Sequence, residues 1–164
     1  PISSHTRLET PTNLRHVITG RGERKMANQS RGQGGHLIFK MNALEDPGMI
    51  KLLYRASQAG VRIDLLVRGL CCLRPGIPGV SENIRVISIL GRFLEHSRIF
   101  HFANGGKEET YLGSADWMPR NLFERCEVVF PVKDKAARTR IQDEILAEYL
   151  ADTAKARLMP EDGS

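Results

Sequence analysis

The chain has 164 residues and a formal net charge of +5, a size that suits a single domain with a core of its own. Its composition is ordinary for a globular protein, and no apolar run approaches the roughly 20 residues of a membrane span, which excludes a membrane-spanning helix in this sequence. The three cysteines are odd in number and match no metal-binding spacing, so we expect reduced thiols and a cytoplasmic location.

The first 35 residues are expected to form an irregular basic arm. Residues 1–36 hold six basic and two acidic side chains, whereas the rest of the chain holds 18 basic and 17 acidic ones. Such an arm weakly favours a polyanionic partner. An ordered domain is expected at 36–158 and a short tail at 159–164. Because the chain begins at Pro1 rather than Met, we expect a fragment or a processed chain.

A strand, a helix and a second strand follow the arm. Leu37–Phe39 is a short apolar strand. Asp46 and Pro47 are typical of a helix start, since aspartate caps free amide groups and proline fits the first turn. Gly60 suits the end of that helix. Val61–Val67 then reads as a largely buried strand, so the pattern predicts a βαβ unit.

A loop rich in glycine and proline extends from Arg68 to Gly79. Arg68 lies just past the carboxyl end of the preceding strand, where open α/β sheets bind ligands. The planar fork of arginine matches phosphate oxygens, although an isolated loop arginine such as Arg68 or Arg74 is more often a surface residue. The loop lacks the GxxxxGK[ST] pattern, which excludes a P-loop.

The second half of the chain predicts a β-rich segment followed by a helix. Asn104-Gly105-Gly106 is a strong hairpin signal, and Asp134 is a good cap for the final helix. We predict strands at Ile84–Leu90, 96–102, 110–116 and Cys126–Val132. The fold class is therefore α/β, with a mixed β-sheet flanked by helices.

The predicted hairpin carries the side chains that best suit phosphoryl chemistry. Because alternate residues of a strand project together, His96 should lie beside Arg98, and Ser114 beside Asp116. Histidine can exchange a proton near neutral pH or be phosphorylated. A lone strand histidine is nevertheless more often structural, and a serine and an aspartate are equally typical of a strand end.

Three further residues could each have either a role at the site or an ordinary structural role. Lys40 and Asn42 share a face at the far end of the first strand, where either could point into the same crevice. Trp117 could stack on a nucleotide base, but it is more typical of an anchor beneath the Met118-Pro119 turn.

Together, these residues resemble the C-terminal catalytic domain of the bacterial-type polyphosphate kinase family. The resemblance covers about residues 40–132, in the segments KMNALEDPGMIKLLYRASQAGVRIDLLVRGLCCLRPG, SENIRV, GRFLEHSRI and YLGSADWMPRN. That domain is similar to half of a phospholipase D-like fold, in which HxK and GSxN groups meet. Arg98 in place of lysine and Asp116 in place of asparagine agree with the kinase branch rather than the phosphodiesterases.

The resemblance implies reversible transfer of the γ-phosphate of ATP to polyphosphate. It implies that His96 assists catalysis and that Arg68 contacts nucleotide phosphates. From their placement at the strand ends, we expect Arg98, Ser114 and Asp116 to complete the phosphate site. The phosphorylated histidine and the ligands of Mg²⁺ are expected in a preceding domain, so no residue here is assigned to a metal. We therefore expect this fragment to have little activity alone.

The implied partners are ATP, ADP, polyphosphate and the rest of a longer kinase chain. A homo-oligomer and a peripheral membrane association stay open, and no nucleic acid is expected. Two other functions remain to be weighed. One is a phospholipase D-type phosphodiesterase or nuclease, which would need a homodimer to complete its site. The other is a non-catalytic module that binds polyanions through the arm and the arginine loop.

Overall fold

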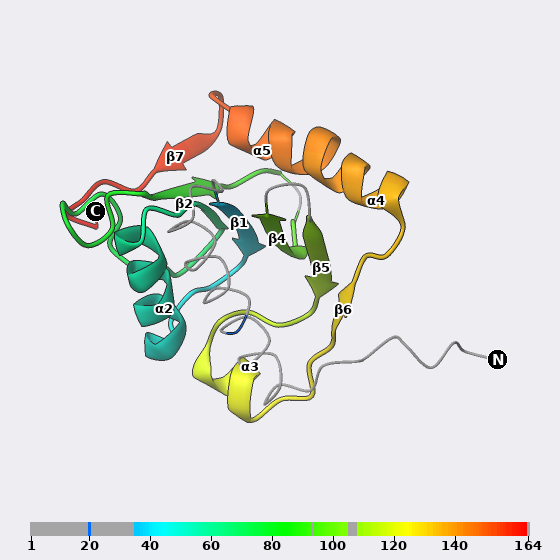
Figure 1. Ribbon diagram of the computed structural model, residues 1–164, viewed down its shortest axis with the longest axis horizontal. Coiled ribbons are helices and arrows are strands. Elements are labelled where there is room, and N and C mark those ends of the chain that lie inside the picture. The colour runs from blue at the N-terminus through cyan, green and yellow to red at the C-terminus, as the bar shows by residue number, and fades with distance from the viewer. Residues whose placement is uncertain (1–19, 21–34, 93, 105–107, 164) are drawn as a thin grey trace.

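The computed structural model describes residues 20, 35–92, 94–104 and 108–163. These ranges form one mixed sheet of seven strands, with helices against both of its faces (Figure 1). This architecture confirms the predicted α/β fold class. The expected basic arm, apart from Gly20 and Gly35, lies outside the described residues, as does the Gly105-Gly106 turn.

The sheet has a parallel centre and antiparallel edges. The parallel strands are β1 (Gly35–Met41), β2 (Arg62–Val67) and β3 (Ile84–Ile89). The antiparallel strands are β4 (Arg98–Asn104), β5 (Glu109–Gly113), β6 (Val129–Pro131) and β7 (Ala156–Leu158). Their order across the sheet is β6-β5-β4-β1-β2-β3-β7. The carboxyl end of β1 therefore lies beside the start of β4.

The predicted βαβ unit is confirmed. Helix α2 (Pro47–Gln58) connects β1 to β2, which are parallel. The carboxylate of Asp46 accepts a hydrogen bond of 2.8 Å from the backbone N–H of Met49, as a capping residue should. Gly60 follows the helix with a φ of 82°, in the left-handed region that favours glycine.

The predicted hairpin is present, but its strands end earlier than expected on the side of the candidate site. β4 and β5 pair antiparallel, and the last pair joins Arg98 to Gly113. His96, Ser114 and Asp116 therefore lie in loops, so their placement on strands was wrong. The pairing stops there because Asp116 and the residue after it bond to the loop that follows β1.

The segment after β5 also differs from the prediction. A short helix, α3 (Pro119–Phe123), precedes β6. The strand predicted over Cys126–Val132 shrinks to the three residues of β6. The backbone N–H of Val128 donates instead to the Ser114 hydroxyl at 3.1 Å, because the chain at Ser114 has already left β5.

The predicted C-terminal helix is confirmed, with Asp134 accepting a hydrogen bond of 2.8 Å from the Ala137 N–H. It comprises α4 (Lys135–Arg140), a π-helical segment η1 (Ile141–Leu146) and α5 (Ala147–Ala151). Strand β7 then pairs with β3, an element that the sequence did not predict. None of the helices in the described ranges combines the length and apolarity that crossing a membrane requires.

Alternate residues of β1 enter two separate cores. Phe39 and its same-face neighbours pack with α2, whereas Ile38 packs with the C-terminal helix. Trp117 is fully buried beside Phe39 and stacks on Phe100 at a centroid distance of 5.6 Å. Trp117 is thus a core anchor, and its alternative role as a base-stacking residue is excluded by burial.

Candidate functional site

Four chain segments meet at one edge of the sheet. The antiparallel pairing of β1 with β4 places Lys40 opposite Ile99, so the residues before β4 lie beside the carboxyl end of β1. Arg68 follows the neighbouring strand β2, and Asp116 follows β5. The topology therefore brings together side chains that are up to 76 residues apart in the sequence.

The centre of this group is a buried ion pair between Arg98 and Asp116. Nη2 and Nε of Arg98 donate to the two carboxylate oxygens of Asp116 at 2.7 and 3.2 Å, and each residue is 7% exposed. The backbone N–H of Asn42 adds a hydrogen bond of 2.7 Å. Burial acts to raise the pKa of Asp116, but the bonds from Arg98 and Asn42 outweigh it, so that the pKa lies below its usual value.

The side chain of Asn42 links this ion pair to the loop before β4. In the orientation that satisfies both ends of its amide, the oxygen accepts from Nε and Nη2 of Arg98 at 3.1 and 2.9 Å. Its nitrogen donates to the carbonyl oxygen of Glu95 at 3.2 Å. Asn42, which shares a face of β1 with Lys40, therefore belongs to the site.

His96 is exposed, yet its imidazole is held by Arg98. Nη1 of Arg98 lies 2.6 Å from Nδ1 of His96 and donates to the His96 carbonyl oxygen at 2.8 Å. A guanidinium has only donors, so Nδ1 must accept, and the neutral ring carries its proton on Nε2. Nε2 is thus the ring nitrogen that Arg98 leaves available to contact a substrate. The predicted contact between the side chains of His96 and Arg98 is confirmed, although His96 lies in a loop and not on a strand.

With these contacts, Arg98 has used all of its hydrogen-bond donors. Its five N–H groups are directed to Asp116, to Asn42 and to two atoms of His96. Direct contact of Arg98 with a phosphate would therefore require one of these bonds to break.

Lys40 is a second buried cation, and it contacts the same loop. The residue is 5% exposed, and Nζ donates to the hydroxyl and carbonyl oxygens of Ser97 at 3.0 and 3.3 Å. Nζ also lies 3.8 Å from a carboxylate oxygen of Glu95. Burial lowers the pKa of Lys40; Glu95 opposes this effect, while Arg98 and Arg68 add to it.

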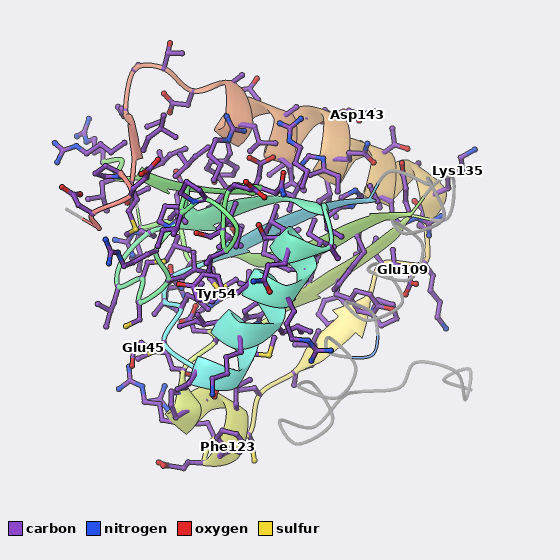
Figure 2. The ribbon with its side chains drawn as sticks, turned by 60° about the vertical axis from the view of Figure 1, so that its left-hand side comes forward. Glu45, Tyr54, Glu109, Phe123, Lys135 and Asp143 are labelled. Atoms are coloured by element: carbon purple, nitrogen blue, oxygen red, sulfur yellow. The ribbon has the colours of Figure 1, made fainter. Side chains whose placement is uncertain are left out.

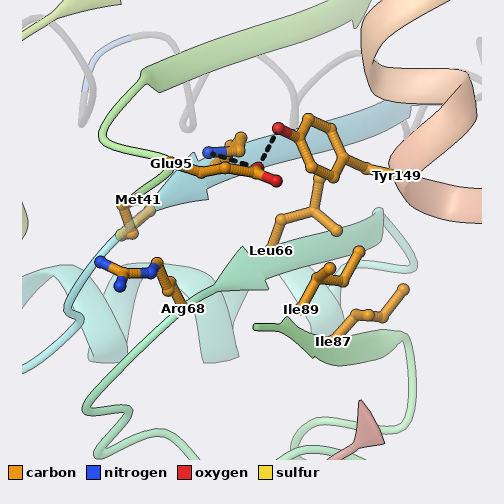
Figure 3. A pocket seen from close by; sticks show the side chains of 8 residues that line it. Met41, Leu66, Arg68, Ile87, Ile89, Glu95 and Tyr149 are labelled. Carbon is orange, nitrogen blue, oxygen red and sulfur yellow. Dashed lines mark hydrogen bonds and ion pairs between the residues drawn. The ribbon is translucent and has the colours of Figure 1, made fainter. Parts of the chain in front are cut away.

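A small cavity separates Lys40 from Arg68. It is lined by Lys40, Met41, Leu66, Arg68, Ile87, Ile89, Glu95 and Tyr149, and it encloses about 10 Å³ (Figure 3). That volume holds about one water molecule, so a phosphate group cannot enter the cavity as it stands. Figure 3 shows Tyr149 reaching from the C-terminal helix to Glu95, whose carboxylate accepts its hydroxyl hydrogen.

The remaining predicted residues fall into two groups. Arg68 is half-buried and borders the site, held through its backbone by Met41 and Ser88. Ser114 is exposed, and its hydroxyl donates to Glu127 rather than to the ion pair. Arg74, the other loop arginine, donates to the carbonyl oxygen of Glu161 at 2.9 and 3.1 Å, so it holds the C-terminal segment and not the site.

Sequence reasoning did not identify the contact between Tyr149 and Glu95, which joins residues 54 positions apart. No local pattern in the sequence predicts such a contact.

The chain matches the family described as "Polyphosphate kinase C-terminal domain 2" over residues 8–164. It is 55% identical over 157 residues to polyphosphate kinase 1 of Chlorobaculum tepidum, covering 96% of this chain and 22% of that protein. It is 54% identical to a polyphosphate kinase of Pseudomonas aeruginosa, covering 96% of this chain and 23% of the relative. The chain thus spans less than a quarter of these relatives.

Comparison with solved structures supports the same family. A polyphosphate kinase from Porphyromonas gingivalis matches with a TM-score of 0.86 and 50% identity, over 90% of this chain and 22% of that one. The phospholipase D family member Nuc from Salmonella typhimurium matches with a TM-score of 0.63 over 94% of this chain and 97% of its own, but with only 11% identity. The second likeness confirms the phospholipase D-like fold and nothing more. The chain belongs to the polyphosphate kinase C-terminal domain 2 family.

Proposed function

We propose that this domain forms one side of the active site of a longer polyphosphate kinase. The reaction is reversible transfer of the γ-phosphate of ATP to a polyphosphate chain, with ADP as the other product. The observation that carries the proposal is the linked set Asp116–Arg98–His96, which presents an oriented imidazole at the sheet edge. Its setting in a domain shared with proteins named polyphosphate kinases supports the substrate class.

In this proposal His96 is a general acid or base, or an electrostatic partner, for the transferred phosphoryl group. The tautomer that Arg98 holds carries its proton on Nε2 and therefore fits the role of acid or hydrogen-bond donor. Arg68 neutralises charge on the nucleotide phosphates. Arg98 contributes its charge and holds the imidazole, since its own donors are occupied. Asp116 fixes Arg98, and Ser114 remains a candidate phosphate contact at the exposed end of β5.

The donor set does not fit a resident magnesium site. No three histidine, cysteine, aspartate or glutamate side chains of the described ranges gather in a way that could hold a metal ion. Asp116 and Glu95 are engaged by the cations beside them. Magnesium would arrive with the phosphates of ATP, and its protein ligands are expected outside this chain.

The location and partners follow from this assignment. ATP as the donor favours the cytoplasm, as the sequence predicts. The rest of the kinase chain is needed to supply the phosphorylated histidine. Peripheral membrane association and a homo-oligomer stay predictions, and nucleic acid is not expected as a partner.

The test compares the full-length kinase that carries this domain with the isolated 164-residue chain. For the forward reaction both are given ATP, Mg²⁺ and a polyphosphate primer, and the ADP and polyphosphate formed are measured. For the reverse reaction both are given ADP, Mg²⁺ and polyphosphate, and the ATP formed is measured. We expect synthesis and its reversal from the full-length protein and little from the isolated chain. Hydrolysis of a model phosphodiester by the isolated chain, without kinase activity in the longer protein, would favour the phosphodiesterase alternative.

A further inference from the structure

His96 lies in a loop whose neighbouring residues are both held by one buried lysine. Nζ of Lys40 donates to the hydroxyl and carbonyl oxygens of Ser97 at 3.0 and 3.3 Å. It also lies 3.8 Å from the carboxylate of Glu95. Since Glu95 precedes His96 and Ser97 follows it, Lys40 constrains the chain on both sides of the exposed imidazole.

Tyr149 holds the same loop from the C-terminal helix. Its hydroxyl donates to Oε2 of Glu95, the oxygen that also faces Lys40. The ammonium of Lys40 lies 5.0 Å from the centre of the Tyr149 ring, within the range of a cation–π contact. Burial and then Glu95 raise the pKa of Tyr149, so its hydroxyl stays a donor at neutral pH.

A direct role for Lys40 as a phosphate ligand fits the structure poorly. Lys40 is 5% exposed, and its ammonium is engaged with oxygens of the loop. The cavity between it and Arg68 holds about 10 Å³, far less than a phosphate needs. What Lys40 and Tyr149 can affect is the position of the loop.

We propose that Lys40 and Tyr149 are positioning residues that fix His96 by holding the residues on either side of it. This inference rests on the proposed function of His96. Phosphoryl transfer depends on positioning, and a misplacement of about 1 Å can cost on the order of a hundredfold in rate. Residues 94–97 take part in no strand pairing, so side-chain contacts hold them. The C-terminal helix thereby becomes part of the active site.

The experiment uses the full-length kinase that carries this domain. Tyr149→Phe and Lys40→Met are each made in the parent and in a His96→Ala background. Tyr54→Phe is the matched control, because Tyr54 lies on α2 across the sheet from the C-terminal helix (Figure 2) and its hydroxyl accepts from the Arg74 N–H at 3.0 Å. The kcat, the KM for ATP and the thermal unfolding temperature are measured for every protein.

We expect Tyr149→Phe and Lys40→Met to lower kcat by about tenfold or more while the KM for ATP changes by less than about twofold. In the His96→Ala background neither should cause further loss, because residues that act through one another are not additive. Tyr54→Phe should behave like the parent.

Losses that multiply in the His96→Ala background would overturn the inference, because they would show an effect independent of His96. A raised KM with unchanged kcat would overturn it as well. If Lys40→Met unfolds the protein, the comparison of Tyr149→Phe in the parent and in the His96→Ala background decides, since this substitution removes a single hydroxyl. Full activity of His96→Ala alone would overturn the proposed role of His96 instead.

Discussion

The guanidinium of Arg98 is bound on one side by the carboxylate of Asp116 and on the other by the ring and carbonyl of His96. A buried charge thus orients an exposed imidazole. Because Arg98 and Asp116 are both largely buried, the pair contributes to the fold as well as to the site.

Asp116→Ala should destabilise the domain strongly. The substitution leaves Arg98 buried without its counterion, which costs about 3–5 kcal/mol in the free energy of unfolding. Chemical denaturation of the chain measures this cost. Asp143→Ala, on the exposed surface of the C-terminal helix, is the control and should change little. A loss below about 1 kcal/mol for Asp116→Ala, the level of a surface pair, would contradict the description of a buried pair.

Acid should weaken the domain through Asp116 and Asp64. Asp64 is buried, and although burial acts to raise its pKa, bonds to His36 and Arg85 bring the pKa below the ordinary value. Carboxylates with a lowered folded-state pKa bind fewer protons when folded than when unfolded. Their contribution is therefore complete above the ordinary value of 3.8 and is lost as the pH falls through the folded-state pKa.

Unfolding free energy measured from about pH 6 down to about pH 2 tests this, because the range spans ordinary carboxylate titration and the lower pH values at which the folded-state carboxylates are protonated. Asp64→Asn and Asp116→Asn should each flatten the decline. A variant that is destabilised at neutral pH but declines as steeply as the parent would contradict the assignment.

Gly113→Ala should disrupt the junction that leads from β5 to Asp116. A Cβ there would lie 2.6 Å from both the carbonyl oxygen of Val128 and Cγ2 of Val129. We expect a loss of about 1–3 kcal/mol in unfolding free energy, as for other overpacked sites. At Gly91 the nearest atom is 3.8 Å away, so Gly91→Ala is the control. Equal stability of the two variants would argue against the close approach of β5 and β6.

Arg68→Gln should impair the full-length kinase without unfolding it. Hydrogen bonds to charged groups contribute about 1.5–3 kcal/mol, so kcat/KM for ATP should fall by roughly 10- to 100-fold. The contacts that hold Arg68 in place are made by its backbone, and the unfolding temperature should stay near that of the parent. Arg74→Gln should leave kcat/KM unchanged, because Arg74 holds Glu161 instead. Equal losses in both variants would contradict a specific role for Arg68.

The sequence correctly predicted those elements that depend on interactions between neighbouring residues. The caps at Asp46 and Asp134 each bond an N–H three residues further on, and such contacts can be inferred from neighbouring residues alone. The hairpin and the βαβ unit follow from equally local patterns.

The features that were missed depend on contacts between distant segments. Asp116 leaves its strand because its carboxylate binds the N–H of Asn42, 74 positions away. Strand β7 forms only because β3 offers it an edge. The alternation of residues along β1 correctly predicted the face on which Lys40 lies. Its burial beneath the His96 loop, however, depends on Tyr149 and Glu95 together.

The most direct test of the central claim is the rate of polyphosphate synthesis from ATP by the full-length kinase carrying His96→Ala. His96 is exposed, so the unfolding temperature should match the parent. Loss of a positioned acid or base should lower kcat by about a hundredfold or more. Synthesis at the parent's rate by the folded variant would contradict the assignment of this site.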